Sequence, residues 1–141
     1  MIDLIEPQTK NLKIIHLEDD HVTQRIVSDF IRIHYSNIEL IQNESGISVC
    51  TDMPFEKPDV IIVDWMLKDC CADQLLNTLR RHKGLVIFFS SMNTQFIRRA
   101  IVSEFGYMPL NFIIMQKTED KAYQKLLKEI ASYARKIKKN V

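Results

Sequence analysis

The residues best suited to chemistry stand directly after apolar runs of the sequence. Glu18 and Asp19 follow the first run, Asp64 follows the third, and Ser90 and Lys117 follow the fourth and fifth. Clustered carboxylates raise one another's pKa unless a cation joins them, and oxygen ligands of this kind select Mg²⁺. Brought together, these residue types predict a phosphoryl-transfer site. The metal and an ammonium would neutralise the phosphoryl group, a hydroxyl would contact it, and a carboxylate would be the nucleophile.

The elements that must position these residues are indicated by five short apolar runs. The runs are rich in Ile, Val and Phe and are continuous rather than alternating, which is typical of strands buried on both faces of a parallel sheet. They cover residues 12–17, 38–42, 60–63, 85–89 and 112–115. Because ligands bind outside the carboxyl ends of such strands, we expect the acids, the hydroxyl and the lysine to converge at one edge of the sheet.

Stretches with helical spacing lie between the runs. Four apolar stripes predict helices, through Val22, Ile26, Phe30 and Ile33; Ala72, Leu75, Leu76 and Leu79; Ile97, Ile101 and Phe105; and Ala122, Leu126, Ile130, Ala134 and Ile137. Asp20 and Asn93 are suited to cap the first and third of these helices. Between residues 46 and 58 a short helix is expected, bounded by Pro54 and Pro58. The alternation of strand and helix predicts an α/β fold with right-handed crossovers.

The composition fits one globular domain of 141 residues, with 46% hydrophobic and 26% charged residues. A net charge of +1 does not favour nucleic acid or a membrane surface as a partner. No apolar run approaches the ~20 residues of a membrane helix, and residues 1–11 lack the features of a secretory signal. Three cysteines, an odd number, are typical of reduced thiols, so we expect a soluble cytoplasmic protein.

Along nearly its whole length the sequence resembles the receiver domain of two-component response regulators. The motifs that carry the resemblance are Leu17-Glu18-Asp19-Asp20, the run from Pro58 to Leu67 around Asp64, Phe89-Ser90-Ser91, and Lys117. Their separations fit βαβ units of about 30 residues. The resemblance implies a receiver domain over residues 12–141, after an N-terminal extension over residues 1–11. It also implies a flavodoxin-like sheet of five parallel strands in the order 2-1-3-4-5, with helices on both faces.

The resemblance also implies roles at a metal site. Asp64 would be the phosphoacceptor, and Asp19 would bind Mg²⁺ directly, with Mn²⁺ as an accepted substitute. Glu18 would assist through a water molecule, and the Met66 backbone carbonyl would be a further ligand. Members of the family take phosphate from a phosphohistidine on a sensor histidine kinase or a phosphotransfer protein. They also phosphorylate themselves from small phosphodonors and usually hydrolyse the product slowly.

Two further residues have implied roles in switching. Ser90 would sense the phosphoryl group and Lys117 would pair with it, and the altered surface would bind a downstream protein. The sequence departs from the family pattern at three positions: Lys68 and Thr118 replace prolines, and Ile114 replaces the aromatic residue that usually reads out the phosphorylated state. We therefore expect the chemistry to be retained more fully than the switching.

Two other functions stay open. The departures from the family pattern favour a receiver-fold scaffold that is never phosphorylated, although Tyr107 or Phe112 could substitute for the missing aromatic. A metal-dependent phosphatase with an aspartyl nucleophile typically places a second acid two residues after the nucleophile, where Met66 stands. Cys70 and Cys71 are adjacent and form no zinc-binding pattern, so reduced thiols in a loop are the simpler interpretation.

Overall fold

The computed structural model describes residues 12–47, 57–70 and 72–139. Its centre is a five-stranded parallel sheet in the order β2-β1-β3-β4-β5. The strands are β1 (Leu12–Leu17), β2 (Ile38–Asn43), β3 (Val60–Val63), β4 (Leu85–Ser90) and β5 (Phe112–Gln116). The predicted sheet and its strand order are confirmed, and every strand lies within one residue of its apolar run.

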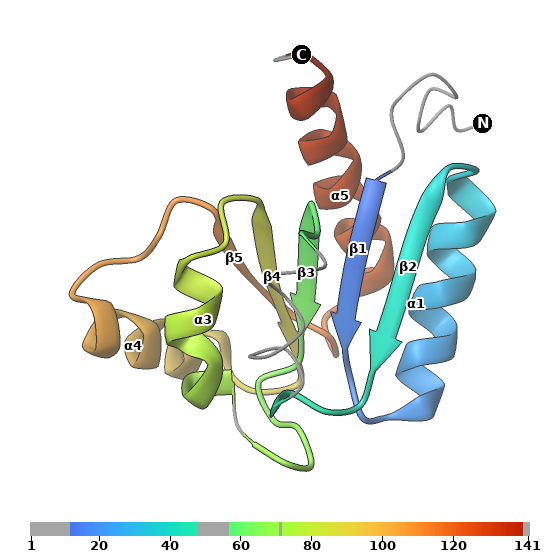
Figure 1. The fold of residues 1–141 in the computed structure, drawn as a ribbon. Coiled ribbons are helices and arrows are strands. Elements are labelled where there is room, and N and C mark those ends of the chain that lie inside the picture. The colour runs from blue at the N-terminus through green and yellow to red at the C-terminus, as the bar shows by residue number, and fades with distance from the viewer. Residues whose placement is uncertain (1–11, 48–56, 71, 140–141) are drawn as a thin grey trace.

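Helices cover both faces of the sheet (Figure 1). They are α1 (His21–His34), a 3-10 turn η1 (Ala72–Leu75) continued by α3 (Leu76–Arg80), α4 (Thr94–Phe105) and α5 (Ala122–Lys139). Side chains of α1 and α5 pack on one face of the sheet, and those of α3 and α4 pack on the other. All five strands run in one direction, so their carboxyl ends lie together at the lower edge in Figure 1.

The predicted caps fix where two helices begin. The Asp20 carboxylate accepts the backbone N–H and the hydroxyl of Thr23, and the Asn93 side chain accepts two amides of the first turn of α4. The α4 helix ends at Gly106, whose φ of 81° is a left-handed conformation that glycine adopts without strain. Because both caps lie at the carboxyl edge of the sheet, they also fix the loops that follow β1 and β4.

Burial differs between the inner and outer strands. The residues of β1, β3 and β4 are almost all buried, as their continuous apolar runs predict. In contrast, β2 and most of β5 are only half-buried, because each has a neighbouring strand on one side alone. Asp64 follows the central strand β3, so the predicted site is built on the most deeply buried part of the sheet.

The predicted buried face of α1 is wrong at two of its four positions, whereas Phe30 is partly buried against the core. Val22 and Ile33, members of the predicted stripe, are 66% and 76% exposed. The residues of α1 that are buried are Thr23, Val27 and Ile31, which follow one another at a spacing of four. This face is rotated by about one residue from the predicted stripe, roughly 100° around the helix. Thr23 can be buried because its hydroxyl is satisfied by the capping carboxylate.

Some predictions fall outside the described residues. The extension over residues 1–11 does so, as do most of the short helix expected between residues 46 and 58, Cys50 and Cys71. Cys70 is described, and it is buried in the loop after β3. Among the helices that the structure describes, none is long and apolar enough to cross a membrane.

Candidate functional site

Hydrogen bonds between strands continue past the strand ends and bring the predicted residues to one level of the sheet edge. Leu17 pairs with the last residue of β3, and the Asp64 N–H donates to the Leu17 carbonyl at 3.0 Å. On the other side of the site, the Lys117 N–H donates to the Ser90 carbonyl at 2.8 Å. Residues far apart in sequence therefore leave neighbouring strands side by side.

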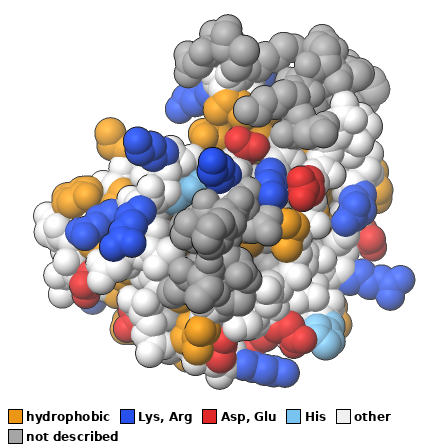
Figure 2. All heavy atoms as spheres, in the orientation of Figure 1, with side chains coloured by type: hydrophobic (Ala, Val, Ile, Leu, Met, Phe, Trp, Pro, Cys, Tyr) orange, Lys and Arg blue, Asp and Glu red, His pale blue; other side chains and the backbone are white. Residues whose placement is uncertain are grey.

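Three carboxylates gather at this edge, those of Glu18, Asp19 and Asp64. Each offers an oxygen, and these oxygens all lie within 4.8 Å of one another. Glu18 and Asp64 are buried, with 1% and 8% of their surfaces exposed, and Asp19 is half-buried. Acidic side chains also gather along the lower edge of the face in Figure 2, where the strands of Figure 1 end. An all-oxygen set of this size fits a hard divalent cation that keeps some of its waters.

The Lys117 ammonium lies against two of the three carboxylates. Its Nζ donates to Glu18 Oε1 at 2.8 Å and to Asp64 Oδ2 at 3.2 Å. Only 14% of the lysine side chain is exposed, so solvent screens these ion pairs little. The sequence separations are 99 and 53 residues, and the predicted convergence at strand ends accounts for both contacts.

Burial and charge act in opposite directions on these groups. Burial raises the pKa of Glu18, the hydrogen bond from Lys117 lowers it, the Asp64 charge raises it again, and the resulting pKa is about 7. Burial also works to lower the pKa of Lys117, but its bond to Glu18 and the two nearby negative charges outweigh burial and raise that pKa. Three acids thus face one ammonium, and the pocket can accept further positive charge.

Ser90 and Met66 stand beside the charged groups. Ser90 is buried at the end of β4, and its Oγ accepts the Met92 N–H at 3.2 Å. The Met66 N–H donates to Asp64 Oδ1 at 3.4 Å, while the methionine side chain is half-exposed. The Asp64 carboxylate is therefore oriented on Oδ1 by the Met66 backbone amide and on Oδ2 by the Lys117 ammonium.

The aromatic residues that could substitute at the readout position lie in different environments. Ile114, which occupies that position, is partly buried against the core on the α3–α4 face. Phe112 is buried and packs edge-on against Phe88 and Phe105, at ring-centroid distances of 5.3 and 6.2 Å. Tyr107 is 52% exposed in the loop after α4. Phe112 is therefore a core residue, and Tyr107 is the surface aromatic of this pair.

Sequence reasoning missed a polar layer beneath the acids, formed by His16, Gln42 and Gln24. His16 is 1% exposed, and burial, followed by the Lys117 charge, lowers its pKa to about 3. In the parallel pairing of β1 with β2, Gln42 stands directly opposite His16. A signal was present in the sequence, because His16 interrupts an otherwise apolar stretch near the end of its run.

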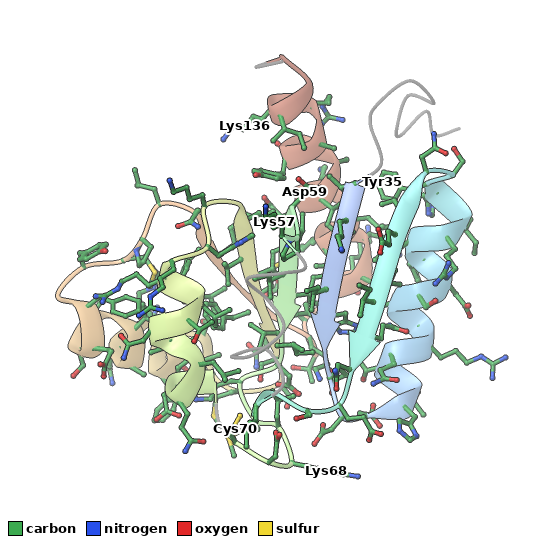
Figure 3. All side chains as sticks on the ribbon, in the orientation of Figure 1. Tyr35, Lys57, Asp59, Lys68, Cys70 and Lys136 are labelled. Atoms are coloured by element: carbon green, nitrogen blue, oxygen red, sulfur yellow. The ribbon has the colours of Figure 1, made fainter. Side chains whose placement is uncertain are left out.

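Hydrogen bonds hold the loop after β3. The Asp69 carboxylate accepts the Ser45 hydroxyl at 2.5 Å and the Gly46 amide at 3.0 Å, and these bonds lower the pKa of Asp69 to about 2. A Cβ on Gly46 would lie only 2.6 Å from the Cys70 sulfur, so the two loops pack too closely for a side chain. Figure 3 shows Lys68 and Cys70 in this loop at the lower edge. The loop after β3, in which Lys68 replaces the usual proline, is thus held in place by the Asp69 carboxylate.

Comparison with known proteins identifies the fold. No family model and no curated protein matches the sequence. A response regulator from Chloroflexus aurantiacus superposes with a TM-score of 0.70 at 15% identity, over 89% of this chain and 99% of that one. The activated N-terminal receiver domain of RstA from Klebsiella pneumoniae gives 0.67 at 22% identity, over 87% and 98%. The Mn²⁺-bound form of the response regulator Rcp1 gives 0.66 at 14% identity, over 86% and 93%.

At these identities the likeness concerns the fold alone. The chain has the fold of response regulator receiver domains over most of its length, which confirms the fold that the sequence resemblance implied. The ends of β1, β3, β4 and β5 carry the predicted residues within this fold.

Proposed function

We propose that the chain is a response regulator receiver that accepts a phosphoryl group on Asp64 in a Mg²⁺-dependent phosphorelay. The donor would be a phosphohistidine on a sensor histidine kinase or a phosphotransfer protein in the cytoplasm. The output would be a protein–protein contact made by the receiver domain itself, residues 12–141. The observation that carries the proposal is the contact of one ammonium, that of Lys117, with both Glu18 and Asp64 inside a cluster of three carboxylates.

The donor atoms suit a hard divalent cation. Asp19 and Asp64 would bind it through their carboxylates, the Met66 carbonyl would add a third oxygen, and Glu18 would act through a water molecule. When bound, the cation supplies positive charge to the oxygens of the transferring phosphoryl group. The mutual proximity of the three carboxylates supports this assignment. Mg²⁺ is the expected ion, and Mn²⁺, present in the Rcp1 structure, is a substitute with the same preference for oxygen.

Asp64 acts as the nucleophile in this proposal. One of its carboxylate oxygens attacks the donor's phosphorus, so that a P–O bond forms, the P–N bond of the phosphohistidine breaks, and the leaving imidazole takes up a proton. The Lys117 ammonium, already bonded to Glu18 and Asp64, compensates the added negative charge. The Ser90 hydroxyl, whose oxygen accepts the Met92 N–H, would donate its hydrogen to a phosphoryl oxygen, and this new bond would begin the switch.

Phosphoramidate tests the proposal, because it carries a P–N bond as phosphohistidine does. Incubated with phosphoramidate and Mg²⁺, the wild-type chain should gain the mass of one phosphoryl group, and chelation of the metal should prevent the gain. Asp64→Asn should gain nothing. Asp73→Asn, a change to an exposed acid in η1, is the matched control and should behave like the wild type. An unmodified wild type, or a modified Asp64→Asn variant, would overturn the proposal.

A phosphorylation-independent scaffold is the second candidate. The observation that favours it is again the Lys117 ammonium, since a lysine that already bridges two carboxylates compensates their charge without any metal. Trp65, the single tryptophan of the sequence, follows the acceptor directly and packs on Phe88 at 5.8 Å. Titration with Mg²⁺ should change the Trp65 fluorescence if the pocket binds metal. An unchanged signal at millimolar Mg²⁺, together with no phosphoryl gain, would favour the scaffold.

A further inference from the structure

The polar layer of His16, Gln42 and Gln24 is a continuous series of hydrogen bonds that ends on the acid cluster. The Gln42 side-chain amide donates to His16 Nδ1 at 3.0 Å and to the Gln24 backbone carbonyl at 2.8 Å. The Gln24 side-chain amide donates in turn to the Glu18 backbone carbonyl at 2.5 Å. The series therefore links β1, β2 and α1, and it ends on the peptide group between Glu18 and Asp19.

The direction of every hydrogen bond in the polar layer is determined. A side-chain amide nitrogen can only donate, so His16 Nδ1 must be the unprotonated acceptor. Both amide hydrogens of Gln42 are then used, one by His16 and one by Gln24. A network in which each donor has one acceptor holds its members in a single arrangement.

The backbone of Glu18 is held through both of its peptide groups, the one shared with Leu17 and the one shared with Asp19. The Glu18 N–H, at the start of that residue, donates to the Asn43 carbonyl at the end of β2 at 3.0 Å. The Glu18 carbonyl, at the other end, accepts the Gln24 side chain from the first turns of α1. The orientation of the Glu18–Asp19 peptide plane affects the direction in which the Asp19 side chain leaves the backbone. This matters for Asp19, because it is the least buried of the three acids.

We infer that Gln24 is a positioning residue for the metal site and that Gln42 and His16 support it. The inference rests on the proposed function, since it concerns the same three carboxylates. Gln24 acts by fixing the peptide that carries Glu18 and Asp19, and it is not itself a ligand. Residues that orient ligands in this way typically change metal affinity by about 10-fold to 100-fold when they are replaced.

Replacing Gln24 by methionine tests the inference, because methionine has a similar length and no N–H to donate. Mg²⁺ binding to the full chain is measured by calorimetry for the wild type and for Gln24→Met. We expect the dissociation constant to rise about 10-fold. Gln124→Met, at an exposed glutamine of α5, is the matched control and should bind Mg²⁺ as the wild type does. Gln42→Met removes the hydrogen bond to the Gln24 backbone carbonyl and leaves the bond from Gln24 to Glu18 in place. It should therefore raise the dissociation constant less than Gln24→Met does, about 3-fold.

A second measurement separates positioning from simple stability. The Asp19 amide belongs to the same peptide group as the Glu18 carbonyl, so its ¹⁵N chemical shift should change in Gln24→Met without metal and should stay unchanged in Gln124→Met. If Gln24→Met and Gln42→Met bind Mg²⁺ like the wild type and only unfold more easily, the polar layer is purely structural and the inference is overturned. If the wild type itself binds no Mg²⁺, the proposed function fails together with the inference. Mg²⁺ binding by the wild type thus distinguishes failure of the inference alone from failure of the proposed function.

Discussion

The two halves of the carboxyl edge of the sheet differ in the kind of residues that support them, polar on one side and apolar on the other. Beneath the acids, on the β1–β2 side, lies the polar layer, in which every hydrogen bond has a fixed direction. On the β4–β5 side, the paired residues just before Ser90 are apolar, with Phe89 opposite Met115 and Phe88 opposite Ile114. Hydrogen bonds restrict orientation, whereas apolar packing tolerates small shifts of its members.

This difference separates the chemistry of the site from its readout. The acid cluster and the Lys117 hydrogen bonds are formed by Glu18, Asp19, Asp64 and Lys117, and Ile114 takes no part in them. The β4–β5 half contains two of the three departures from the family pattern, at Ile114 and at Thr118, and the third, Lys68, lies in the loop after β3. We therefore expect loss of the Lys117 contacts with the acids to alter phosphoryl transfer strongly, and changes at Ser90 and Ile114 in the β4–β5 half to alter it less.

The largest effect is expected for Lys117→Met. This variant keeps the length of the side chain but removes the only ammonium that contacts Glu18 and Asp64 among the described residues. The rate of phosphorylation by phosphoramidate should fall about 100-fold, comparable to the loss of one oxyanion donor in an enzyme. Lys128→Met, at an exposed lysine of α5, should leave the rate unchanged. A fall of less than 5-fold in Lys117→Met would mean that the pocket does not depend on this charge.

A smaller effect is expected for Ser90→Ala in the β4–β5 half. The hydroxyl contributes one neutral hydrogen bond to the phosphoryl group, so the phosphorylation rate should fall about 10-fold. The same rate assay with phosphoramidate and Mg²⁺ gives the comparison with Lys117→Met. An equal or larger fall in Ser90→Ala would erase the distinction between the two halves.

The polar layer should make stability depend on pH. The pKa of His16 is lowered to about 3 in the folded chain, so the unfolded chain binds the additional proton when the pH falls below the ordinary value of 6.5. Stability from this residue is therefore present above that pH and is lost on acidification. Glu18, with its pKa raised to about 7, acts in the opposite sense, because its stabilisation is present at low pH and is lost as the pH rises towards 7.

His16→Val isolates the histidine contribution from that of Glu18. The free energy of unfolding of the wild type should fall relative to that of His16→Val by about 1 kcal/mol between about pH 6.5 and pH 5.5. Urea denaturation of both proteins at each pH gives this difference. If the difference between the two proteins is the same at both pH values, His16 is not held neutral by burial.

The smallest effect is expected for Ile114→Tyr, which restores an aromatic residue at the readout position. The position is partly buried against the core on the α3–α4 face, and Ile114 is not a member of the acid cluster. The Mg²⁺ dissociation constant and the phosphorylation rate should both stay within about 2-fold of the wild type, since separated sites act additively. A change of 10-fold in either quantity would show that the two halves are coupled.

Much of the fold and the position of the site could be predicted because both follow from the central strands. Continuous apolar runs indicate buried strands, and strand ends at one edge account for a contact between Lys117 and Glu18 across 99 residues. The roles of Asp64, Lys117, Ser90, Met66 and the metal ligands remain predictions, since neither the fold nor the comparisons test them.

The misses have a common physical cause. The apolar stripe of α1 was misplaced because Thr23 is buried through a side-chain hydrogen bond, which hydrophobic spacing does not reveal. Gln24 and Gln42 were missed for the same reason, since a glutamine in a helix or an edge strand usually faces water. His16 stood out in its run, but its partner could be named only once the register of β1 with β2 was known.

The most direct test of the account is to locate the phosphoryl group on the chain. Borohydride reduces an acyl phosphate to an alcohol, which would convert a phosphorylated aspartate into homoserine. After treatment with phosphoramidate and Mg²⁺, followed by borohydride, peptide mapping should find homoserine at position 64 and unchanged acids at positions 18 and 19. Homoserine elsewhere, or an unmodified residue 64 in a chain that has gained phosphate, would contradict the account.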